Sequence, residues 1–295
     1  MRRTRFSLLA AGLAATAVFA AGCGSDDKSS EPTKVAVKAT EAGKGQYTLE
    51  APSEIKGGVV ELTLDNAGNQ APHSASLTQI GEGHTLAEAE AIFASFESPK
   101  PQEVPEWIRL YGGVGETAPG ETGTATVKLD EGHYVITDDA QNGAKEPAST
   151  EFDVTESGDG DLPDTDAKVT AAETGEEDPE WEWKIDGLKA GENTFTFVSE
   201  GEKALHHIVA FPIIGDATID DVKQQLDQDG PPSGPPVVDF EKGVSTAVID
   251  GDKSEVTQFN LEAGRYAFVC FLPDRDKPEE SHFKEGLLKE VNITK

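Results

Sequence analysis

A cysteine and a histidine near the end of the chain are the residues with the clearest chemical potential. Cys270 ends an apolar stretch, and His282 follows twelve positions later, shortly before Leu287. A thiolate and an imidazole are both ligands for transition metals, so the two together could form part of a metal site. A lone cysteine after an apolar stretch also occurs as a small buried hydrophobic residue. These residues alone leave both interpretations open.

The other cysteine follows an N-terminal leader. Three arginines within residues 1–5 precede an apolar, alanine-rich stretch over 6–21, which is shorter than the about 20 residues of a membrane-spanning helix. Small residues then precede Cys23, and this pattern resembles a bacterial lipobox. We expect residues 1–22 to be a signal peptide and Cys23 to carry a lipid anchor, so that the protein is extracytoplasmic and attached to the cell membrane. An ordinary cleaved signal peptide, with Cys23 incidental, is the alternative.

Export determines whether the second cysteine, Cys270, is expected to form a disulfide. In an oxidising compartment, cysteines that can pair become disulfides. If Cys23 carries lipid, Cys270 has no partner within the chain, because these are the two cysteines of the sequence. The unpaired thiol therefore requires an explanation of its own.

The chain is strongly acidic. It has 25 Lys+Arg against 55 Asp+Glu, a formal net charge of −30, and removal of the leader with its arginines makes the charge three units more negative. This charge excludes nucleic acid as a partner and disfavours electrostatic binding to anionic lipid, so attachment depends on the anchor. A solvated, repulsive surface explains the acids most simply, and docking of a cationic redox partner is the second interpretation.

An internal repeat with an offset of 133 residues organises the chain. Residues 58–78 align without a gap to residues 191–211, and each segment is typical of a strand, a turn and a second strand. Thr85 and Thr218 keep the same offset, and each begins a short helix with an acid three residues later in the capping position. The repeat predicts two copies of one domain.

A second pair of segments matches further along the two copies. Residues 132–134 correspond to residues 264–266, which places Asp138 of the first copy at the position of Cys270. The scaffold therefore does not require a cysteine at this strand end.

Short period-2 strands separated by turns, with one short helix inserted in each copy, predict an all-β protein of two tandem antiparallel β-sandwiches. The three tryptophans are predicted to lie on strands and to pack in the core or between domains: Trp107, Trp181 and Trp183. The predicted segments after the leader are a tether over 23–33, a first domain over 34–155, a linker over 156–166 and a second domain over 167–295.

The second domain resembles plastocyanin- and azurin-like cupredoxins. In that family a strand ending in Gly-x-Tyr-x-Phe-x-Cys leads into a Pro-containing loop with a His and then Gly-Met, and another His lies upstream. This chain has the corresponding residues His206, Gly264, Tyr266, Phe268, Cys270, Pro273, His282 and Gly286. The resemblance implies Greek-key sandwiches in both copies. It also implies one copper ion in the second, bound by His206, Cys270 and His282, for electron transfer or copper handling.

Copper that cycles between two oxidation states favours a thiolate and two imidazoles in a plane, with a weak axial ligand. The chain departs from the family in two ways: eleven residues separate Cys270 from His282, where the family has a much shorter loop, and Leu287 replaces the methionine. Leucine cannot ligate, so the site would be three-coordinate. The acids of the loop either supply an oxygen ligand or are solvated: Asp274, Asp276, Glu279 and Glu280.

Either of two adjacent histidines, His206 and His207, could be the upstream ligand. His73 shares a strand face with apolar residues and is therefore expected to face inward. The alignment matches His73 to His206, so His206 is the histidine expected to face inward. Exchange with His207 stays open, because the residues on the His207 face are apolar too. A preformed site requires ligating atoms within about 5 Å of one another, since metal–ligand bonds are only about 2 Å long.

The first domain keeps His73 but lacks the other ligands, so we expect it to bind no copper and to be a spacer, a docking module or a copy that has lost its site. The chain has no Gly-x-Ser-x-Gly, His-Glu-x-x-His, P-loop or Cys-x-x-Cys motif, and we expect no enzyme. The alternative function is a metal-free pair of β-sandwiches that acts as a binding or structural module at the cell surface.

Overall fold

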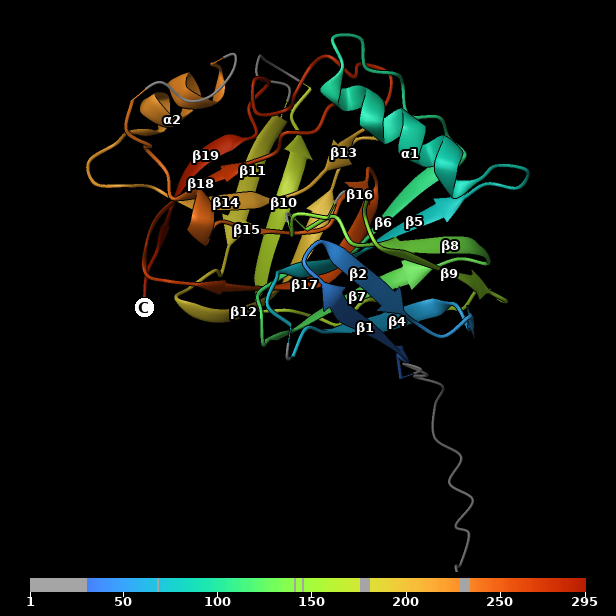
Figure 1. The fold of residues 1–295 in the computed structure, drawn as a ribbon. Helices are drawn as coiled ribbons and strands as arrows, with labels where there is room; N and C mark the ends of the chain where they lie inside the picture. The colour runs from blue at the N-terminus through green and yellow to red at the C-terminus, as the bar shows by residue number, and fades with distance from the viewer. Residues whose placement is uncertain (1–30, 68, 141, 145, 176–180, 229–233) are drawn as a thin grey trace, which may run out of the picture.

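The computed structural model describes residues 31–295 except 68, 141, 145, 176–180 and 229–233 (Figure 1). The first half contains β1 (Thr33–Gly43), β2 (Gln46–Glu50), β3 (Glu54–Ile55), β4 (Gly58–Asp65), β5 (His73–Ile80), α1 (Leu86–Ala94), η1 (Ser95–Glu97), β6 (Ile108–Thr117), β7 (Thr122–Leu129), β8 (Gly132–Thr137) and β9 (Ser149–Val154).

The second half contains β10 (Ala167–Glu173), β11 (Trp181–Asp186), β12 (Gly191–Ser199), β13 (Leu205–His206), β14 (Val209–Pro212), α2 (Ile219–Leu226), η2 (Phe240–Lys242), β15 (Val244–Ser245), β16 (Ile249–Asp250), β17 (Lys253–Leu261), β18 (Gly264–Val269) and β19 (Leu288–Ile293). Strands are the main secondary structure, which confirms the prediction that the protein is mostly β. The predicted signal peptide and the lipid site at Cys23 lie outside the described residues. Within the described part, no helix is long and apolar enough to span a bilayer.

The strand pairings of the first half recur in the second. β1 pairs with antiparallel β2 and parallel β4, and β10 pairs in the same way with β11 and β12. β4 pairs with β7 as β12 pairs with β17, and β5–β8–β9 corresponds to β14–β18–β19. The helices also correspond, since α1 and α2 each begin with a threonine capping box, at Thr85 and Thr218.

The prediction of purely antiparallel sheets is wrong for three pairs: β1–β4, β10–β12 and β3–β9 are parallel. The cause is clearest at β10, where the hairpin partner β11 reverses the chain before β12 returns along the other edge of β10. Alternation of apolar and polar residues gives a strand's buried face, but it does not give the direction of its neighbour.

Two sheets continue across the junction between the halves (Figure 1). One runs β11-β10-β12-β17-β7-β4-β1-β2, and the other runs β13-β16-β6-β5-β8-β9-β3. The junction pairs are Val256 with Thr126 and Ile249 with Tyr111. The short strand β13, which ends at His206, therefore belongs to a sheet that lies mostly in the first half.

Separate apolar clusters fill the two halves, and a third cluster joins them. The third contains Ile80, Ile108 and Leu110 of the first half together with Leu205, and Leu272 packs against it. The predicted strand positions of Trp181 and Trp183 are confirmed on β11, and both side chains are buried. The prediction for Trp107 is wrong: it lies in the turn before β6, where it stacks on His84.

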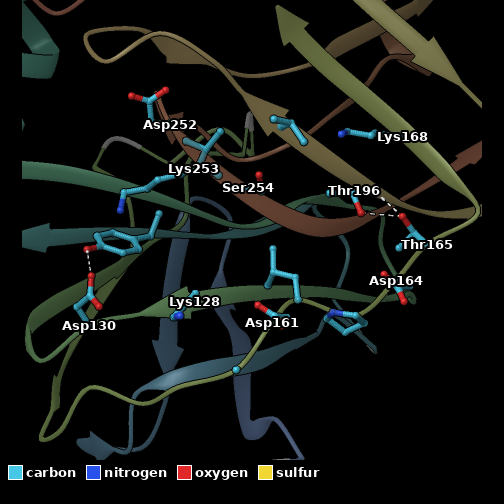
Figure 2. A pocket seen from close by; sticks show the side chains of 16 residues that line it. Lys128, Asp130, Asp161, Asp164, Thr165, Lys168, Thr196, Asp252, Lys253 and Ser254 are labelled. Atoms are coloured by element: carbon cyan, nitrogen blue, oxygen red, sulfur yellow. Dashed lines mark hydrogen bonds between the residues drawn. The ribbon is translucent and has the colours of Figure 1, made fainter. Parts of the chain in front are cut away.

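The segment between the halves is fastened to both. Gly57 N donates to Glu156 O at 2.9 Å in the first half, and Thr165 Oγ1 lies 2.7 Å from Thr196 Oγ1 in the second. Residues 160–165 line a cleft of about 730 Å³ together with side chains of both halves (Figure 2). The segment is therefore part of the packed junction.

A glutamate is buried at this junction. Glu255 on β17 is fully buried, its Oε2 accepts a hydrogen bond of 2.9 Å from Gly113 N, and its Oε1 has no partner in the described part of the chain. Gly112 has φ +75°, and a Cβ there would lie 2.2 Å from Glu255 Oε2, so only glycine fits beside the carboxyl. Burial raises the pKa of Glu255 to about 8, and the Gly113 hydrogen bond opposes the rise.

This buried acid predicts a stability that falls as pH rises. The folded protein retains a proton on Glu255 up to about pH 8, whereas the unfolded chain loses it near its ordinary pKa of about 4.3. The contribution of Glu255 to stability is therefore largest below that pH and decreases as pH rises from there through 8. We expect Glu255→Gln to remove this contribution and to raise the free energy of unfolding at pH 8 by on the order of 4–5 kcal/mol.

Urea denaturation at pH 5 and pH 8 measures the effect. The matched control is Glu192→Gln, an exposed glutamate on the adjacent strand β12. Equal pH profiles for the wild type and Glu255→Gln would contradict this assignment.

Candidate metal centre

Cys270 and His282 lie at the two ends of a loop that backbone hydrogen bonds close. Cys270 directly follows β18, and its amide donates to Leu287 O at 3.0 Å. The His282 amide donates to Leu272 O at 2.9 Å, and the Leu287 amide donates to His282 O at 2.8 Å. Both side chains are fully buried. The backbone therefore fixes both residues at the same end of the second half.

The structure brings the thiol and this imidazole together. Cys270 Sγ and His282 Nδ1 are 3.8 Å apart. A metal about 2.3 Å from sulfur and about 2.0 Å from nitrogen, with a trigonal angle between them, separates two such donors by about 3.7 Å. The distance therefore fits two ligands of one metal and satisfies the limit of about 5 Å.

His206 presents the third donor. Its ring centroid lies 4.7 Å from that of His282. Nδ1 is hydrogen-bonded to Ser199 Oγ at 2.9 Å, whereas the buried Nε2 has no hydrogen-bond partner among the described residues. Burial, with smaller contributions from the charges of His282 and His207, holds the pKa of His206 well below its usual range. A neutral imidazole with a free nitrogen is the form that binds metals.

His207 has a different role. Its Nε2 accepts a hydrogen bond of 3.1 Å from the amide of Phe271, directly after Cys270. Burial and the nearby His282 lower the pKa of His207 to about 4, so the ring stays neutral and can accept. Because this nitrogen is occupied and that of His206 is free, the geometry favours His206 as the ligand.

A carboxylate supports the second nitrogen of His282. Asp274 Oδ1 lies 3.1 Å from His282 Nε2, an arrangement that directs Nδ1 towards Cys270 and is common behind metal-binding histidines. Of the other acids of the loop, Asp276 forms an ion pair with Lys203. Asp274 was a candidate oxygen ligand on sequence grounds, whereas its contact is with the far side of the imidazole.

The surroundings of the thiol are apolar. Leu287 is fully buried and belongs to the same cluster as Cys270, and burial raises the pKa of the Cys270 thiol to about 12. The polar atom facing Sγ from the strand side is the Leu205 carbonyl oxygen, at 3.8 Å. A backbone oxygen could act as a weak additional ligand if copper were bound by the thiolate, and no sequence pattern indicated it.

Trp181 covers the site, a role that the sequence did not reveal. Its ring centroid lies 4.7 Å from that of His206, at 78°, and 4.9 Å from that of His282. The side chain is 3% exposed, so it excludes water from the imidazoles. The alternation of β11 indicated that the residue is buried, but no sequence signal connected it to the histidines.

The first half carries a different arrangement at the corresponding place. Asp138 replaces the cysteine, and its Oδ2 lies 2.6 Å from His73 Nδ1. Glu41 lies 3.6 Å from His73 Nε2 on the other side, too far for a hydrogen bond, so this buried nitrogen also has no hydrogen-bond partner among the described residues. Tyr47 packs edge-on against the ring at 4.9 Å and 78°, as Trp181 does against His206. Two carboxylates therefore contact the buried imidazole in the first half, where a thiol and a second imidazole lie near it in the second.

Among the described residues, no three His, Cys, Asp or Glu side chains are grouped so that they could hold a metal ion as they stand. Cys270 and His282 have the spacing of two ligands, and a third has to come from His206. The donor types and the free Nε2 of His206 fit a metal, although the three side chains are not grouped as a ready site.

No protein-family model matches the chain, and no curated protein does so. The solved structures that are similar in part include the following three. Auracyanin B is 18% identical over 43% of this chain and 87% of its own, with a TM-score of 0.26. Lac15 from a marine microbial metagenome is 12% identical over 90% and 67%, with a TM-score of 0.21. A laccase from Botrytis aclada is 12% identical over 88% and 63%, with a TM-score of 0.22. Likeness at these scores assigns neither family nor activity.

The buried His73–Asp138 pair should contribute more to the free energy of unfolding than an exposed pair does. Asp138→Ala removes the partner of a fully buried imidazole, and we expect it to lower the free energy of unfolding by about 3–5 kcal/mol. The matched control is Asp153→Ala, which breaks the exposed pair of Asp153 with His133 and should change stability little. Urea denaturation near pH 7 compares them, and equal losses in the two variants would contradict the structural role of Asp138.

Proposed function

We propose that the protein is a copper-binding protein with two tandem cupredoxin-like sandwiches, and that its second half binds one copper ion through His206, Cys270 and His282. The observation that carries the proposal is the pairing of the 3.8 Å Cys270–His282 spacing with the unpartnered Nε2 of the buried His206. Copper would supply a one-electron couple at this place. Electron transfer or copper handling follows as the function.

The protein's own groups favour a rigid, dry site. The fully buried thiol loses its proton when a metal binds, so binding releases acid and depends on pH. Asp274 holds His282 from behind, and Ser199 holds His206. Trp181 and Leu287 exclude water. Ligands held in this way reorganise little when a charge is added or removed.

A metal-free binding or structural module at the cell surface is the second candidate. Two observations favour it: no ready group of three ligands exists among the described residues, and Cys270 sits in an apolar cluster that suits a small buried hydrophobic residue. Under this candidate the free nitrogen of His206 has no function.

Titration of the purified protein with copper(II) separates the two candidates. We expect one copper per chain and an intense visible thiolate-to-copper absorption band. The band should be absent from Cys270→Ser and strongly reduced in His206→Ala, because each variant removes a ligand. The control is His84→Ala, which alters a histidine stacked on Trp107 in the first half and should leave the band unchanged.

Absence of the band from the copper-treated wild type would exclude a copper–thiolate site. If metal analysis also finds no bound copper, the metal-free candidate is the correct one.

We also propose that the protein is a lipoprotein on the outer side of the cell membrane, with a cationic redox partner. The lipobox-like sequence before Cys23 and the net charge of −30 support these two assignments. No catalytic motif supports an enzyme, so a non-enzymatic role stays the prediction.

Lipidation has a direct test. We expect the wild type to partition into detergent and to carry a diacylglycerol on Cys23, because acyl chains bury apolar surface in the membrane. Cys23→Ser should lose the lipid mass and partition into the aqueous phase. Recovery of the wild type as an unmodified aqueous protein would contradict the assignment.

A further inference from the structure

The long loop between Cys270 and His282 reaches the first half of the chain. Arg275 O accepts a hydrogen bond of 3.0 Å from Val104 N. The Arg275 guanidinium donates from Nη1 to Pro105 O at 3.2 Å and to Val104 O at 3.4 Å. Its Nη2 forms an ion pair with Asp250 on β16. Arg275, a residue of the ligand loop, therefore contacts both the segment that precedes β6 and the strand β16.

The geometry at the base of the loop explains why it is long. Ser281 Oγ donates to Phe271 O at 2.5 Å, and Pro273 and Ser281 form a β-bridge. The residues next to the two ligands are thus already joined, and residues 274–280 are an excursion beyond this closure. Arg275 lies in that excursion, so the extra length serves to reach the first half.

The same excursion holds the segment before His206. Arg275 N donates to Lys203 O at 2.8 Å, and Ala204 forms a bridge with Asp274. His206 itself pairs with Ile249 of β16, which pairs in turn with Tyr111 of β6. Both candidate ligand segments, the strand and the loop, are therefore fastened to elements of the first half.

Arg275 is suited to this position. Its side chain is 11% exposed and that of Asp250 is 9% exposed, so the contact is largely shielded from solvent and from salt. The planar guanidinium donates hydrogen bonds to two carbonyl oxygens and a carboxylate at the same time, and the single ammonium of lysine cannot reproduce this arrangement. Loss of these bonds would leave Asp250 buried without its cationic partner.

We propose that the first half of the chain is a clamp for the metal centre, and that Arg275 is the positioning residue through which it fixes the ligand loop, with Cys270 and His282 at its closed base, against the segment that carries His206. The inference rests on the proposed copper site. The clamp fixes the loop before metal binds, so less conformational freedom is lost on binding. Residues that hydrogen-bond to a metal ligand typically contribute about 10–100-fold to metal affinity, and we expect an effect of that order from Arg275, which acts on the ligands through the loop.

The test uses the full chain and three variants: Arg275→Ala, Arg275→Lys and, as a control, Lys203→Ala. Lys203 pairs with Asp276 of the same loop, but that exposed pair lies within the second half. Hydrogen exchange of the His282 and Leu287 amides is measured without metal, and copper affinity is measured by competition with a chelator. For Arg275→Ala we expect exchange about tenfold faster, the effect of losing one charge-assisted hydrogen bond, and affinity lower by about 10–100-fold.

Arg275→Lys should fall between the wild type and Arg275→Ala, and Lys203→Ala should match the wild type in both measurements. Equal effects of Arg275→Ala and Lys203→Ala would overturn the clamp, as would unchanged loop exchange in both Arg275 variants. If the wild type binds no copper, the proposed function fails, and the exchange rates still decide whether the first half holds the loop. If Arg275→Ala does not fold, Arg275→Lys is judged by the same criteria.

Discussion

A polar nitrogen buried without a partner costs free energy, and His206 Nε2 is such a nitrogen. The aligned histidines, at the start of β5 and at the end of β13, have different surroundings. In the first half carboxylates lie on both sides of His73, although its Nε2 also has no hydrogen bond among the described residues. In the second half the neighbours of His206 are an imidazole, a tryptophan and, across His282, a thiol. A metal ion would bind the free nitrogen and would also replace the thiol proton. One bound ion would therefore account for both the unpartnered nitrogen of His206 and the buried thiol of Cys270.

The junction between the halves determines how firmly this place is held. The strand that carries His206 continues a sheet of the first half, and the loop that carries His282 is fastened there by Arg275. The buried Glu255 lies at the same junction, between β17 and β6. The halves therefore share backbone pairing, apolar packing and buried polar contacts, and the first half contributes to the site although it lacks the thiol.

Parts of this picture could be predicted from the sequence, because they depend on local pattern. Alternation gives strands and buried faces, and the threonine caps mark the starts of both helices. Of the three residues predicted as ligands, the fold places Cys270 next to His282 and His206 next to His282, and their role as copper ligands stays a prediction. The parallel strand pairs, the cover by Trp181 and the contacts of Arg275 depend on pairing between distant segments, which periodicity does not encode. The eleven-residue loop counted against a metal site on sequence grounds, whereas the structure shows that its closed base keeps both ends together.

X-ray absorption at the copper edge of the loaded protein tests the proposed ligands, because it reports the atoms bound to the metal. We expect one sulfur at about 2.3 Å and two nitrogens at about 2.0 Å, with the sulfur lost in Cys270→Ser. A first shell of nitrogen and oxygen alone in the wild type would contradict this expectation, because copper would then be bound elsewhere than between Cys270 and the two histidines.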